Sequence, residues 1–169
     1  MLKLTVLAGQ EWTYGSIAYE LGLSSSVVHS AVKRAIQAQL FNEHERRPRF
    51  KALEEFLIHG VKYAFVPDVG SLTRGIPTAF AAPVFRGEFG SFDEDMNIYV
   101  WPHPRGEHRG MGLSPLHKSV PEAVERDQAL HDALAVLDAL RIGRAREQRF
   151  AENILREMLH HAKAQVSIC

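Results

Sequence analysis

The apolar residues in the first third of the chain repeat at helical spacing. Residues 1–9 are ambiguous, because their apolar positions fit both the alternation of a strand and one face of a helix. Residues 14–41 predict two helices separated by Gly22, and Ser24 is the expected N-cap of the second. A third helix is predicted over residues 50–59 and is expected to end at the glycine that follows.

The middle of the chain lacks this periodicity. β-forming residues predict strands at 61–66 and 97–101, and residues 110–113 are expected to pair with the second strand. No long element is expected over residues 67–90, because this stretch contains the breakers Pro67, Gly70, Gly75, Pro77, Pro83, Gly87 and Gly90. From Pro121 the helical pattern resumes and predicts two helices with a break at Gly143.

These patterns predict an α+β protein that is mostly helical and has three parts. A helical N-terminal domain over residues 1–60 precedes a loop-rich module with short strands over 61–120, and a helical tail follows over 121–169. The tail is expected to form a homodimer or to bind a partner. The apolar side chains expected at that seam are Leu130, Leu134, Leu137, Phe150, Ile154 and Met158.

Composition narrows the class of protein. Hydrophobic residues make up 46% of the 169 residues and charged ones 24%, which is typical of a globular chain. The apolar stretches are far shorter than the roughly 20 residues that span a bilayer, so we expect no membrane segment and a cytoplasmic protein. The single cysteine, Cys169, excludes a disulfide core and a cysteine-based zinc module.

Charge is balanced overall but uneven along the chain. Lys+Arg and Asp+Glu number 20 each, so net charge indicates no particular partner. Residues 21–42, however, contain no acidic residue. A local positive field is what a phosphate-facing surface needs, although so slight an excess is also typical of ordinary solvated surface.

Residues 14–34 have the pattern of a helix-turn-helix. Ala18 is small where two helices must cross closely, Gly22 suits a turn with positive φ, Leu23 fills the gap between the helices, and Ser24 caps the second helix. The side chains expected to face outward from that second helix, ready to enter a major groove, are Ser25, Ser26, His29, Ser30, Lys33 and Arg34.

This stretch resembles the winged helix-turn-helix of bacterial transcription regulators, of which the MarR-like group is the most similar. The resemblance covers about residues 1–60 and rests on Ile17-Ala18, Leu21-Gly22-Leu23-Ser24, Val28, Ala31-Val32-Lys33-Arg34 and Leu40-Phe41. It departs from the family at Ala35 and Gln39, and the segment after Phe41 is short for a two-stranded wing.

The resemblance implies sequence-specific binding of double-stranded DNA by a repressor or autoregulator. If the resemblance holds for function, Arg46, Arg47 and Arg49 are wing residues that contact phosphate or the minor groove. The alternative interpretation is that these three arginines belong to a solvated loop. The arginines of the tail (Arg141, Arg144, Arg146 and Arg149) are expected to form ion pairs instead.

Other chemistry finds little support in the sequence. Glu157 and His160 have half of a carboxylate di-metal motif without its second copy, and His103 and His108 lack metal-ligand spacing. No nucleophile elbow or phosphate-binding glycine loop is present, so we predict no enzyme, no metal and no cofactor.

One alternative and one segment stay open. The alternative is an antitoxin or immunity-type interaction protein that binds a protein partner through residues 61–169 and autoregulates through the helix-turn-helix. In the segment Thr73–Thr78, Arg74 could reach an anion or a partner chain, or the segment could be a structural turn. The residues do not separate these readings.

Overall fold

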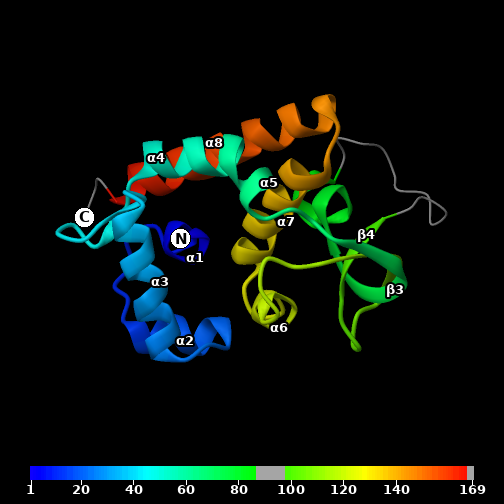
Figure 1. The fold of residues 1–169 in the computed structure, drawn as a ribbon, viewed down its shortest axis with the longest axis horizontal. Helices are drawn as coiled ribbons and strands as arrows, with labels where there is room; N and C mark the ends of the chain where they lie inside the picture. Colours follow the sequence, from blue (N-terminus) through cyan, green and yellow to red (C-terminus); the bar gives the residue numbers. More distant parts are fainter. Residues whose placement is uncertain (87–97, 167–169) are drawn as a thin grey trace.

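The computed structural model describes residues 1–86 and 98–166, which form an α+β protein (Figure 1). Four residues named in the sequence analysis therefore lie outside the described residues: Gly87, Gly90, Asn97 and Cys169. The α-helices are α1 (Leu2–Val6), α2 (Tyr14–Leu21), α3 (Ser25–Gln37), α4 (Phe50–Glu55), α5 (Val61–Ala64), α6 (Val120–Val124), α7 (Gln128–Ile142) and α8 (Ala145–Val166). The strands are β1 (Phe41–Asn42), β2 (Arg47–Pro48), β3 (Val69–Thr78), β4 (Tyr99–Pro102) and β5 (His108–Leu113).

The ambiguous N-terminus is helical, and α1 lies between the two ends of the molecule (Figure 1). Its Lys3 is buried and forms ion pairs with Glu20 of α2 and with Asp127, at 2.7 Å from the latter. Burial alone would lower the pKa of Lys3, but hydrogen bonds to Asp127 and Glu20 outweigh it, and the pKa is raised. Asp127 is also the N-cap of α7, so Lys3 joins three helices at one point.

The predicted end of the third helix at Gly60 is wrong, and so is the predicted strand over 61–66. The helix continues from α4 through a π-helical turn (Phe56–Gly60) into α5. A Cβ at Gly60 would lie 2.9 Å from the ring of Phe56, so the glycine makes room for that ring within the helix. Here Gly60 serves packing and does not terminate the helix.

The expectation that residues 67–90 form no long element is also wrong, because β3 has ten residues. It pairs antiparallel with β4 and with β5, and β4 pairs parallel with β5, which closes the three strands on themselves. A Cβ at Gly75 would lie 2.1 Å from the carbonyl oxygen of Trp101, so only glycine permits this close approach. The predicted pairing of residues 110–113 with the strand before it is confirmed, with the two strands parallel.

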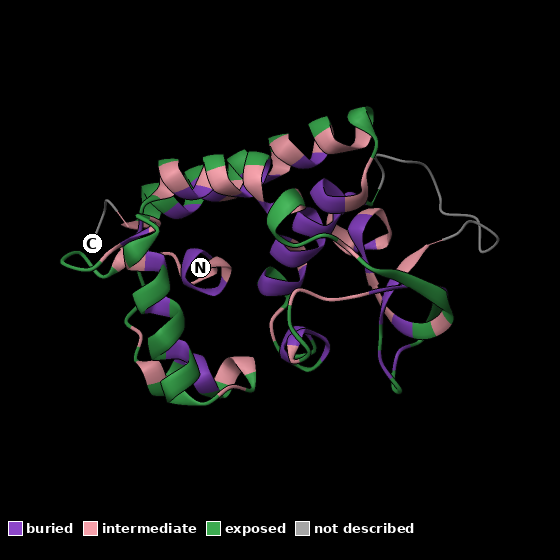
Figure 2. Cartoon of the chain, viewed as in Figure 1, coloured by how far each residue is buried: buried purple, intermediate pink, exposed green. Residues whose placement is uncertain are grey.

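The main core crosses the boundaries expected at residues 60 and 120. Buried side chains from α4 and the π-turn, from the short helices Ala79–Ala81 and Pro83–Phe85, and from α7 and α8 form one cluster. Helices α4 and α8 pack together along one side of the molecule, where Arg156 donates to Glu54 at 3.0 Å. Figure 2 shows α7 buried along nearly its whole length.

The tail therefore does not present the apolar seam expected for a dimer. Leu130, Leu134 and Leu137 are all buried within the chain. Phe150, Ile154 and Met158 pack against the main core, which includes Leu137. The break predicted at Gly143 is confirmed, since α7 ends at Ile142 and α8 begins at Ala145. No helix in the described ranges combines the length and the apolar character that crossing a membrane requires.

A buried ionic network fastens the strands to α7. Asp138 is 1% exposed and accepts hydrogen bonds from Thr78 Oγ1 at 2.9 Å and Trp101 Nε1 at 2.7 Å. Its other oxygen pairs with Arg141 Nη1 at 2.6 Å. Burial raises the pKa of the Asp138 carboxyl, while the positive charge of Arg141 and the three donors act in the opposite direction. The carboxylate is fully supplied with donors only while Arg141 is present.

We predict that Arg141→Ala costs about 3–5 kcal/mol of unfolding free energy, because it leaves the charge of Asp138 buried without its counterion. It also removes the donor to the Phe65 carbonyl, which Arg141 Nε contacts at 2.8 Å. Urea denaturation measures the effect. The control is Arg144→Ala, an exposed position one turn away, which should change stability by no more than about 0.5 kcal/mol. Equal losses from the two variants would contradict the role of this network.

Candidate nucleic-acid interface

The helix-turn-helix is built by caps at both of its helices. Thr13 caps α2 through a reciprocal pair of hydrogen bonds with Ser16. Gly22 ends α2 with φ of 63°, as predicted, and the amide of Leu23 then donates to the Ala18 carbonyl at 2.8 Å. Ser24 is the N-cap of α3, as predicted, since its side chain accepts from the amide of Val27. These caps fix the angle at which α3 leaves the turn.

One face of α3 is buried and the opposite face is open to solvent. Val28, Val32 and Ala35 pack with Ile17 and Ala18 of α2 in a small core of their own. Figure 2 shows α3 largely exposed along its outer side. The predicted outward residues are all exposed: Ser25, Ser26, His29, Ser30, Lys33 and Arg34.

The exposed residues of α3 differ in how much they are held by their neighbours. The Oγ atoms of Ser26 and Ser24 lie 2.9 Å apart, and the ring of His29 stands edge-on to Tyr14 at 5.1 Å between centroids. Lys33 and Arg34 form no ion pair within the described part of the chain. Two cations one position apart are therefore available to a ligand, on a helix that carries no acid.

Sequence reasoning missed three exposed positions on this helix, and Ala31, which the helical pattern places on the inward side with Val28 and Val32, is one of them. Val27 is 45% exposed, at the end of α3 that follows the turn, and Gln37 is exposed in its last turn. The apolar side chain of Val27 could contact a thymine methyl, and the amide of Gln37 could read a base edge. Helical spacing alone places Val27 and Gln37 outside the buried stripe, so the periodicity of α3 would have found them.

After α3 the chain forms a small hairpin, in which Phe41 pairs with Pro48 and Asn42 pairs with Arg47. The side chain of Asn42 accepts hydrogen bonds from the amides of His44 and Glu45, which tightens the loop between the strands. Each strand has only two residues. The hairpin thus lies next to the C-terminal end of α3.

The three arginines of this region have different surroundings. The guanidinium of Arg46 lies 4.6 Å from the centre of the Trp12 ring, and Trp12 Nε1 donates to the Arg46 carbonyl at 3.3 Å. Arg47 donates to Glu45 at 2.7 Å, and this bond lowers the pKa of the Glu45 carboxyl. Arg49 is exposed and forms no ion pair within the described residues. Of the three, Arg49 is the most accessible to an anion.

Trp12 was not predicted to have a role, although it anchors the hairpin. Its ring stands edge-on to Tyr14 and to Phe41, with centroids 5.5 and 6.2 Å apart. Arg46 in turn donates to the Trp12 carbonyl at 3.4 Å. The contact joins residues 34 positions apart, and no local pattern in the sequence indicates it.

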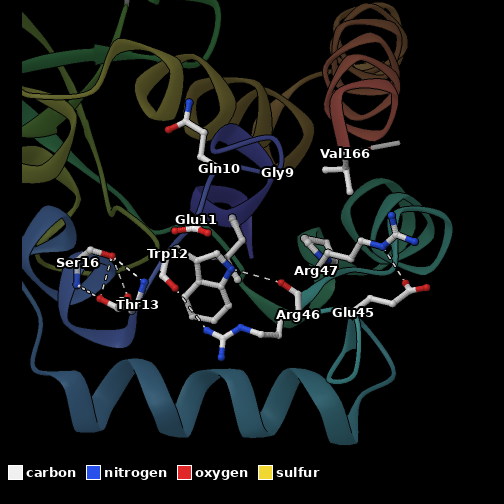
Figure 3. A pocket seen from close by; sticks show the side chains of 12 residues that line it. Gly9, Gln10, Glu11, Trp12, Thr13, Ser16, Glu45, Arg46, Arg47 and Val166 are labelled. Carbon is white, nitrogen blue, oxygen red and sulfur yellow. Dashed lines mark hydrogen bonds and ion pairs between the residues drawn. The ribbon is translucent and has the colours of Figure 1, made fainter. Parts of the chain in front are cut away.

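A cleft of about 770 Å³ lies beside this anchor (Figure 3). The loop from Gly9 to Thr13, the hairpin residues Glu45 to Pro48, and Val166 at the end of α8 line it. The charged side chains that line the cleft include both carboxylates and guanidinium groups. Helix α3 contributes no residue to it. The cleft and the exposed face of α3 are therefore separate surfaces that share the hairpin.

Comparison of the chain with known protein families, with curated proteins and with solved structures found no match. Over residues 1–86 and 98–166, no group of three or more side chains of the metal-ligating types lies close enough together to hold an ion.

We predict that Trp12→Ala loosens the hairpin while leaving the global fold intact. The variant removes a cation–π contact, a hydrogen bond and two aromatic contacts, which together are worth about 1–3 kcal/mol. Amide hydrogen exchange of Asn42 and of Arg49, whose amide bonds to Leu40, should accelerate by about tenfold or more. The control Tyr63→Ala removes an equally aromatic but 75% exposed side chain and should leave this exchange unchanged.

Proposed function

We propose that the protein binds double-stranded DNA through α3 and acts as a transcription regulator of the winged helix-turn-helix type. The observation that carries the proposal is that the outer face of α3 is exposed and free of acids, and that it presents short polar and basic side chains beside Val27 and Ala31, on a helix capped at its start. Such a helix can enter a major groove with its N-terminal end forward. The resemblance of residues 1–60 to MarR-like regulators supports the same function.

In this proposal the hairpin β1–β2 takes the place of the wing. Its strands are short. Because the guanidinium of Arg46 is packed over the ring of Trp12, it can contact DNA only in the orientation that this packing imposes. Arg49 has no such constraint within the described residues and is the better candidate for a phosphate contact. Arg47 would have to exchange Glu45 for phosphate, which reduces the net gain of that contact.

Specific affinity from one small helix-turn-helix usually requires two half-sites, so a homodimer on DNA is part of the proposal. Because the apolar face of the tail is buried within the chain, the dimer contact would come from another surface. A second candidate function is an antitoxin or immunity-type interaction protein that autoregulates through α3. The observation that favours it is a group of exposed apolar side chains between residues 63 and 72.

Selection of bound fragments from a random-sequence DNA pool tests the proposal directly. The full chain should enrich a defined sequence, and His29→Ala combined with Lys33→Ala should abolish specific binding to it. The melting temperature should change by only a few degrees, since both side chains are exposed. The matched control is Arg149→Ala with His160→Ala, an exposed basic pair on α8. Enrichment that survives the first double variant would contradict the assignment of α3.

The salt dependence of binding gives a second, quantitative prediction. Each lost phosphate contact lowers the slope of log affinity against log salt by about 0.9. Alanine at Lys33, Arg34 and Arg49 should therefore flatten the slope by a little under 3 for a mixed-sequence duplex. The control is alanine at Arg144, Arg146 and Arg149, which are exposed on the tail. Arg141 cannot serve in this control because it is buried in its pair with Asp138.

An equal loss of slope in both triple variants would mean that DNA also contacts the tail. A loss confined to the tail variant would place the DNA-binding surface on α8 and overturn the proposal for α3.

A further inference from the structure

Exposed apolar side chains are concentrated in one short stretch that the proposed DNA contact does not use. Among the described residues, the large hydrophobic side chains outside α2 and α3 that are exposed all lie between residues 63 and 72. They are Tyr63 at 75%, Phe65 at 46%, Val66 at 73%, Val69 at 46% and Leu72 at 57% exposed. Such a concentration is typical of a surface that another molecule covers.

The same stretch includes the open half of a strand. β3 pairs with β5 along its first part, at Val69 and then from Leu72 to Gly75 with a shift of register between them, whereas its pairing with β4 begins only at Gly75. On the side away from β5, the strand from Val69 to Thr73 therefore faces no strand of the described chain. Unpaired backbone groups on a strand edge can accept a further strand from another protein.

Two arginines stand side by side on this surface. Arg74 of β3 and Arg109 of β5 are directly opposite in the strand register, and both are exposed. Leu72 and Met111 form the neighbouring pair on the same face. Like charges in opposite positions destabilise a sheet, and neither arginine has an ion-pair partner within the described residues. An acidic group from outside would relieve this repulsion.

We propose that the strip from Tyr63 to Arg74, together with Arg109 and Met111, binds an extended segment of a partner protein that carries apolar and acidic side chains. The segment adds a strand at the open edge of β3. Because side chains alternate along a strand, Leu72 and Arg74 share a face, and the partner presents an apolar group to Leu72 and Met111 and carboxylates to Arg74 and Arg109.

Charge argues against a second copy of this chain as the occupant. A symmetric dimer brings the same patch of both copies together, which would place the two arginines of one copy against those of the other. The nearby Lys62, whose ammonium lies 5.3 Å from the centre of the Tyr63 ring, adds to the positive charge. A partner with acidic side chains is complementary to all three cations.

The test selects short random peptides on the immobilised full chain and measures the affinity of the enriched peptides by fluorescence anisotropy. The expected peptides alternate apolar with acidic residues. Their affinity should fall by about tenfold or more for Arg74→Glu combined with Arg109→Glu, and also for Leu72→Ser. The charge-reversed variant should instead bind versions of the peptides in which lysine replaces each acid. The matched control, Arg144→Glu with Arg146→Glu, should bind as the wild type does.

Three kinds of result would overturn the proposal. The first concerns the peptides: either the enriched peptides lack acidic residues, or their binding is unaffected by the variants at residues 72, 74 and 109. The second is self-association in sedimentation that Leu72→Ser abolishes, which would make a second copy the occupant. The third is loss of affinity for a mixed-sequence DNA duplex in Arg74→Glu with Arg109→Glu, which would assign the arginines to DNA. The variants leave α3 unchanged, so failure here is distinct from failure of the proposed DNA contact.

Discussion

The carboxylate of Asp138 is the point on which the two halves of the structure depend. It accepts hydrogen bonds from Thr78 of β3, Trp101 of β4 and Arg141 of its own helix, and no donor–acceptor distance among these exceeds 2.9 Å. Arg141 extends the network to the carbonyls of Phe65 and Ser114, at either end of the strand region. A small closed sheet of three strands has little core of its own, so this buried charge, together with the apolar cluster that joins Trp101 to Leu130 and Leu134, determines where the sheet lies on α7. The cost of burying it is offset only because every oxygen has a donor.

The same helix positions the helix-turn-helix by a second ionic contact. Asp127 caps the start of α7 and binds Lys3, which also binds Glu20 of α2. Apolar contacts follow the same route, since Leu21 of α2 packs both against the core of the helix-turn-helix and against the cluster that contains Val120 and Leu130. Helix α7 thus holds the strands through Asp138 and the helix-turn-helix through Asp127, at opposite ends of its length.

The sequence predicts the elements that depend on local chemistry and misses those that depend on distant contacts. Gly22 and Ser24 act through their own backbone, and both have the predicted geometry. Gly75, in contrast, is needed because the carbonyl of Trp101, from a strand far along the chain, approaches it, whereas a glycine elsewhere breaks an element. The helices predicted for the tail are also present. Periodicity shows which face of such a helix is apolar, but it cannot show which part of the molecule covers that face. The pairing of Trp12 with Arg46 has no local signal.

The arrangement separates the two proposed binding surfaces. Figure 1 shows α2 and α3 at one end of the molecule and β3 and β4 at the other, with α1 and α7 between them. A partner strand added to β3 therefore has no direct access to the outer face of α3. An influence of one ligand on the other that passes through α7 would have to change the packing of that helix, because it carries both junctions, and it could not exceed the difference in affinity between the two packings. Since α7 is buried along most of its length, such a change would disturb the main core. The structure thus favours two ligands that bind independently, with a partner protein affecting DNA binding mainly by adding its own bulk or charge beside the duplex.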